Sequence, residues 1–146
     1  AEGELEMNAK KIFNPKGWLI AFALLHTVMF LVPQLFATSS VLEMGWGVGK
    51  APEHAAFYEI RLGGLGIAYT PMLLAMAFLT SGATRAKMAL VTALAMGLVV
   101  VVDVGMCIQQ EAYLDDMSPL VMVGFPLVIF GGMLASGILH LKEDEA

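Results

Sequence analysis

The sequence predicts an all-α fold: an integral membrane four-helix bundle with both termini on the same side. Hydrophobic residues make up 58% of the 146 residues and charged residues only 14%, whereas soluble domains carry roughly 25% charge. Four apolar stretches account for this composition, and each is long enough to cross the roughly 30 Å hydrocarbon core of a bilayer as a helix. We expect a single domain, residues 1–146, with spans near Gly17–Thr38, Phe57–Thr80, Ala86–Cys107 and Pro119–His140.

The distribution of basic residues predicts the orientation of the spans. Lys50 and Arg61 lie on one side of the predicted bundle, and the other six cations lie on the opposite side: Lys10, Lys11, Lys16, Arg85, Lys87 and Lys142. Because positive residues are retained on the inner side, both termini are expected inside. The chain begins with Ala1 rather than methionine. We interpret this as a mature chain whose targeting segment was removed, with an incompletely known native sequence as the alternative.

Local signals place the beginnings of the helices and the connections between them. Asn14-Pro15 and Ser118-Pro119 are typical helix starts before the first and fourth spans, because an N-cap side chain is followed by proline at the first helical position. Pro33 and Pro71 lie within spans and predict kinks or an early end. We expect residues 39–56 to form a surface loop that rests on the bilayer or on a neighbour.

Small residues recur at helical spacing on three of the four predicted spans. Small side chains three or four residues apart let helix backbones approach closely, which favours association within lipid. We therefore expect close helix contacts at Gly63 and Gly66; at Ala89, Ala93 and Gly97; at Gly132 and Ser136; and at Gly131 and Ala135.

Charged residues within the spans form a first group of candidate site residues. An unpaired charge there costs on the order of 3 kcal/mol on insertion scales. Arg61 and Asp103 fall at similar depth in antiparallel spans, so we predict a structural polar pair between them, with Glu59 at the interface. The alternative is a polar pocket or a proton site at the outer surface.

His26 is the candidate cofactor-binding residue, because it lies near the middle of the first span. A buried imidazole at that depth either ligates a metal, such as chlorophyll magnesium or haem iron, or hydrogen-bonds a neighbouring helix. His54 and His140 are predicted outside the span interior, which argues against haem held by two histidines. No Cys–His metal spacing and no Ser–His–Asp set is present in the sequence, and we expect no metal site.

The octapeptide from Phe57 to Gly64, FYEIRLGG, stands at an outer helix start and resembles the small four-helix membrane proteins called DoxX-like. The resemblance covers this string and the four-span layout. Many such proteins have no assigned activity. A member recovered as a mature chain implies an accessory subunit of a large complex, with an algal photosystem as the setting.

Three functions follow as hypotheses. The first is a non-catalytic accessory subunit that fills or bridges the periphery of a membrane complex. A photosynthetic complex of the plastid thylakoid is the favoured setting, and a bacterial or mitochondrial inner membrane is the alternative. Its partners would be membrane-embedded subunits and lipids, with no nucleic acid, and grooves near Trp46, Tyr58 or His26 would hold chlorophyll, carotenoid or lipid. The second is a small transporter or channel component using Glu59, Arg61 and Asp103. The third is a cofactor-binding subunit of a quinone-linked redox enzyme.

Overall fold

The computed structural model describes residues 2–110 and 124–142, and within these ranges all regular structure is helical. Three helical runs are long and apolar enough to cross a membrane, namely Met7–Phe36, Ala55–Leu79 and Gly82–Met106, and Phe125–Leu139 is a shorter apolar helix. The predicted start of the fourth span at Pro119 lies outside the described residues. The elements in chain order are α1 (Glu2–Ile12), α2 (Pro15–His26), η1 (Thr27–Leu31), α3 (Val32–Phe36), α4 (Thr38–Trp46), α5 (Ala55–Leu79), α6 (Gly82–Gln110) and α7 (Phe125–Leu139).

The first span begins where the sequence predicts. The side chain of Asn14 accepts a hydrogen bond from the backbone N–H of Lys16 at 2.9 Å, and Pro15 occupies the first helical position. This N-cap satisfies one of the backbone donors that a helix start leaves without a partner.

Replacing Asn14 with alanine should therefore destabilise the protein by about 1 kcal/mol, the usual cost of losing such a cap. Thermal unfolding in detergent, followed by circular dichroism, measures the change. Asn8→Ala is the matched control, because Asn8 is exposed on α1. Equal effects of the two substitutions would show that the cap contributes nothing.

A π-helical turn interrupts the first span at its middle. The segment η1 begins directly after His26, and α3 follows it with Pro33 near its start. Proline has no N–H to bond the preceding turn, so the hydrogen-bond ladder must change register around it. A π-helical turn thus lies just before Pro33, where the sequence predicts a kink or an early end, whereas α5 continues unbroken through Pro71.

The prediction of a loop over residues 39–56 is wrong for its first half. Thr38–Trp46 form the helix α4, which ends at Gly47 with a φ of 83°. This left-handed conformation favours glycine. The glycines that we interpreted as loop residues therefore include the end of a short helix, and only residues 47–54 connect it to α5.

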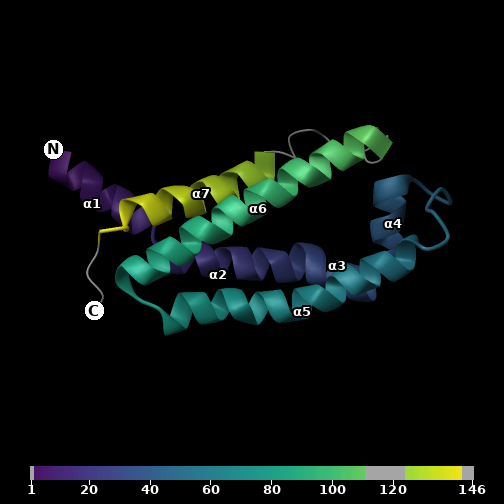
Figure 1. Ribbon diagram of the computed structural model, residues 1–146, viewed down its shortest axis with the longest axis horizontal. Helices are drawn as coiled ribbons and strands as arrows, with labels where there is room; N and C mark the ends of the chain where they lie inside the picture. Colours follow the sequence, from purple (N-terminus) through teal and green to yellow (C-terminus); the bar gives the residue numbers. More distant parts are fainter. Residues whose placement is uncertain (1, 111–123, 143–146) are drawn as a thin grey trace.

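The helices pack as two pairs. α6 lies along α7, and α2 with its continuation lies along α5, while α2 also touches α7 (Figure 1). α5 and α6 diverge from the turn that joins them and make few contacts (Figure 1). The core lies mainly between α2, α5, α6 and α7, and its fully buried side chains include Leu19, Leu73, Met133 and Ser136.

The segments near the two chain ends meet at one end of the bundle. Nε2 of His140, just after α7, lies 3.2 Å from the backbone oxygen of Lys10. The turn between α5 and α6 lies at the same end (Figure 1). There the guanidinium of Arg85 donates to the backbone oxygen of Thr80, and the ammonium of Lys16 lies 4.6 Å from the ring centre of Phe78. Several of the cations that we assigned to one side are thus at one end of the molecule.

Trp18 has a packing role beyond the interfacial anchoring that the sequence suggests. Its indole N–H donates to the backbone oxygen of Ile12 at 3.1 Å, and its ring stacks on Phe13. The other edge of the ring lies against Gly132 of α7, where a side chain would collide with it. Trp18 therefore joins the first span to the last.

Candidate functional site

His26 is the centre of a polar cluster between the first span and α5. Its Nδ1 lies 3.2 Å from Oγ1 of Thr70, and that oxygen lies 3.0 Å from Oγ1 of Thr27. The Thr27 hydroxyl also donates to the backbone oxygen of Ala23 at 2.8 Å. Three polar side chains from two spans are thus linked in one chain of hydrogen bonds.

Aromatic rings surround the imidazole of His26. Tyr69 and Phe22 present their edges to it, with ring centres 5.1 Å and 6.3 Å away. Phe30, one helical turn further along, stacks nearly parallel to it at 6.1 Å. These rings shield the imidazole from water and leave its environment largely apolar.

Two glycines of α5 permit this approach. A Cβ atom on Gly66 would stand 3.1 Å from Cε1 of His26 and 3.7 Å from its Nε2. A Cβ atom on Gly63 would stand 2.8 Å from Cδ2 of Leu35. Both glycines are buried, which confirms the close contact predicted at these positions.

The predicted pair of Arg61 and Asp103 does not form. Both residues are exposed, and within the described residues no ion pair joins them. The physical reason is the divergence of α5 and α6, which separates the far end of one helix from the far end of the other (Figure 1). Similar depth in two antiparallel spans does not place two side chains together when the helices splay apart.

Glu59, which we predicted at the interface, is hydrogen-bonded to the first span. The side-chain amide of Gln34 donates to its Oε2 at 3.2 Å, so this contact joins α3 to α5 at the C-terminal end of the first span. Glu59, Arg61 and Asp103 are therefore not gathered into one site. Likewise, the described residues contain no group of three or more His, Cys, Asp and Glu side chains that could hold a metal ion.

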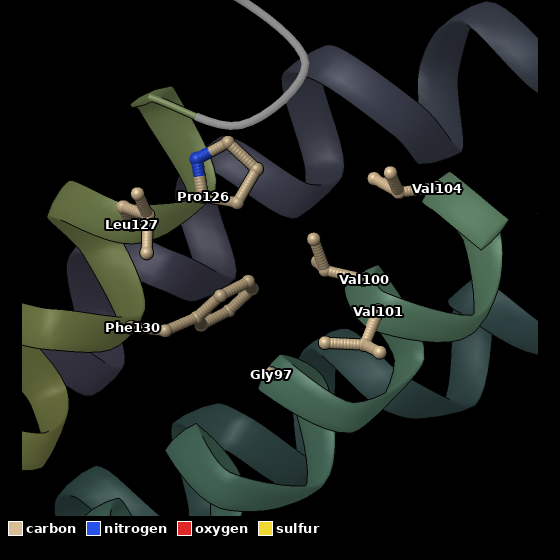
Figure 2. Close-up of a pocket in the computed structure, with 7 residues that line it drawn as sticks. All are labelled: Gly97, Val100, Val101, Val104, Pro126, Leu127 and Phe130. Atoms are coloured by element: carbon tan, nitrogen blue, oxygen red, sulfur yellow. The ribbon is translucent and has the colours of Figure 1, made fainter. Parts of the chain in front are cut away.

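A groove of about 290 Å³ lies between α6 and α7. Figure 2 shows residues of the two helices on its opposite sides, and the lining is almost wholly apolar. The lining residues are Gly97, Val100, Val101 and Val104 from α6, with Pro126, Leu127 and Phe130 from α7. Gly97 thus lines a groove rather than the close helix contact that its spacing predicts.

Comparison with known proteins places the chain in no family. No family model matches the sequence, and neither a curated protein nor a solved structure gives a significant match. The resemblance to DoxX-like proteins and the photosystem setting therefore stay predictions. The site is interpreted from its own geometry.

The sequence analysis singled out His26 but not the threonines that form its hydrogen-bond chain. Thr27 follows it directly, and Thr70 precedes Pro71 of the second span. A hydroxyl residue on each of two spans at matching depth is a signal for an interhelical hydrogen bond. The Gln34–Glu59 contact offered the same signal, because both side chains are polar and lie near adjacent ends of neighbouring spans.

Proposed function

We propose that the chain is a non-catalytic accessory subunit of a larger membrane complex, held in the bilayer as a four-helix bundle. The observation that supports this most strongly is the far half of α6. From Leu94 to Met106 no residue is buried, and at 1.5 Å per residue this is about 20 Å of helix. Large apolar side chains are exposed along it, among them Leu98, Val101 and Val102.

Asp103 lies on this same surface. Among the described residues it has neither an ion pair nor a side-chain hydrogen bond, although it belongs to a helix that is apolar enough to cross a membrane. A carboxylate within a span costs on the order of 3 kcal/mol on insertion scales unless a partner or water compensates it. A neighbouring subunit that packs on the apolar face of α6 and donates hydrogen bonds to Asp103 would meet both needs.

The setting that we propose is a photosynthetic membrane, the plastid thylakoid, where the pigment-ligand role predicted for His26 would have a use. The same bundle would also suit a bacterial or mitochondrial inner membrane. Glu59 accepts a hydrogen bond from Gln34, whereas Arg61 and Asp103 are exposed and, within the described residues, form no ion pair with each other. We therefore do not propose a transport pathway through these three residues.

Purification from the native membrane in mild detergent tests the subunit proposal. A photo-reactive amino acid at Val102 should cross-link to a larger subunit. The same group at Leu65 on α5, which is even more exposed in the isolated chain, should do so far less. Asp103→Ala should weaken retention in the complex. A chain that purifies alone, folded and monomeric, and transports a solute in liposomes would contradict the proposal.

The bundle should also have both ends on the inner side of the membrane. The contact between His140 and Lys10 requires the two end segments to emerge together. Protease added to sealed vesicles of known orientation should cleave near Lys11 and Lys142 from one side only. Cleavage of the two ends from opposite sides would exclude this topology.

A further inference from the structure

The hydrogen bonds around His26 determine which of its ring nitrogens carries the proton. A threonine hydroxyl has one hydrogen to donate. The hydroxyl of Thr27 donates its hydrogen to the backbone oxygen of Ala23, so in the contact between the two threonines Thr70 must be the donor. The hydrogen of Thr70 is then used, and its oxygen can only accept from Nδ1 of His26.

The neutral imidazole therefore has its proton on Nδ1 and a lone pair on Nε2. No described residue gives Nε2 a hydrogen bond. Among the described residues the only fully buried side-chain nitrogen or oxygen without a partner is Nε of Arg85, so Nε2 of His26 is not sealed inside the protein. Gly66, which has no side chain, lies beside it, and Phe30, which stacks on the ring, is 50% exposed to the outside of the bundle.

We infer that Nε2 of His26 is the axial ligand of the metal in a tetrapyrrole that approaches the bundle from the lipid side. A histidine that ligates a metal through one nitrogen generally donates its other N–H to a fixed acceptor, which sets the tautomer and the ring orientation. The Thr70–Thr27–Ala23 chain is such an acceptor. At mid-span depth there is neither bulk water nor a lipid headgroup to occupy the lone pair.

The metal would receive one protein ligand from this chain. The imidazole of His140 lies at the end of the bundle, where its Nε2 is in contact with Lys10, and His54 precedes α5 in an exposed connection. A centre that accepts a single axial nitrogen, magnesium in a chlorophyll or five-coordinate iron in a haem, fits this arrangement. The inference concerns the chain itself and is independent of the subunit proposal.

Pigment binding to the purified chain in detergent tests the inference. Chlorophyll a and haem b are added in separate titrations, and bound pigment is measured by absorbance after gel filtration. We expect one of the two to bind at one per chain, and His26→Leu and His26→Phe to abolish this. His140→Gln is the matched control and should bind as the wild type does. Equal binding by the His26 variants, or no binding of either pigment by the wild type, would overturn the inference.

Nitrogen NMR of the histidine-labelled chain without pigment gives an independent readout. The spectrum should show His26 with a protonated Nδ1 and an unprotonated Nε2, and the opposite tautomer would overturn the inference. Thr70→Val removes the acceptor, so it should mix the two tautomers and weaken pigment binding by about tenfold, the lower range for loss of such a supporting partner. A merely structural Thr70 would leave the tautomer unchanged.

Discussion

Gly132→Ala should destabilise the protein by about 1–3 kcal/mol, the usual cost of adding volume to a packed core. The Cβ atom of an alanine would stand 2.5 Å from Cζ2 of Trp18 and closer still to two further ring atoms. The ring cannot easily move away, because its N–H is bonded to Ile12 and its face is stacked on Phe13. Unfolding in SDS–detergent mixtures, followed by tryptophan fluorescence, measures the loss.

The adjacent glycine is the control for this prediction. A Cβ atom on Gly131 would meet nothing within 4 Å, and alanine is favoured over glycine in a helix by up to about 1 kcal/mol. Gly131→Ala should therefore be neutral or stabilising. The cost of Gly132→Ala should also fall when Trp18 is replaced by alanine, since contacting residues couple in a double-mutant cycle. Additive effects would show that Trp18 is not the obstacle.

The same pair of glycines shows what the sequence could and could not predict. Both small-residue stripes of the last span, Gly132 with Ser136 and Gly131 with Ala135, have the same spacing. Only Gly132 and Ser136 are buried, whereas Gly131 is exposed. Spacing identifies faces on which a helix can approach, but it does not say which face the neighbour occupies.

The long helices were predicted well, because each is marked in the sequence by a long run of mainly apolar residues. The predicted spans Phe57–Thr80 and Ala86–Cys107 correspond to α5 and α6 within a few residues. The short helix α4 was missed because Gly45, Gly47 and Gly49 outweighed the apolar residues before them. Its end at Gly47 depends on one left-handed residue, which a propensity average does not detect.

The sequence indicates one residue of the candidate site, His26, but not the residues that contact it. A lone histidine in a span is visible in the sequence. Its partner Thr70 depends on how the first span rotates against α5, and neither span encodes that rotation by itself. The predicted pair of Arg61 and Asp103 failed for the same kind of reason, since depth is encoded along each span but the angle between α5 and α6 is not.

Gly137→Ala should be the second strongly destabilising substitution, because the added atom would meet the main chain of α6. Its Cβ would stand 2.9 Å from the backbone oxygen of Ala86, 2.9 Å from Cβ of Leu90 and 3.1 Å from the backbone nitrogen of Leu90. The backbone cannot yield as a flexible side chain can, so α7 must shift away from α6. We expect a loss of about 1–3 kcal/mol, as for other overpacked positions.

A second substitution can distinguish the clash at Gly137 from the clash at Gly132. The cost at Gly132 should be relieved by truncating Trp18. Leu90→Ala keeps both the Cβ atom and the backbone atoms that crowd Gly137, so the cost at Gly137 should persist in a Leu90→Ala background. Gly97→Ala is the control on α6, because a Cβ atom there meets nothing within 4 Å. Rescue of Gly137→Ala by Leu90→Ala would mean that the side-chain atoms of Leu90 beyond Cβ, rather than its Cβ and the backbones, set the distance between α6 and α7. Persistence of the cost would identify Gly137 as the residue that permits their close approach.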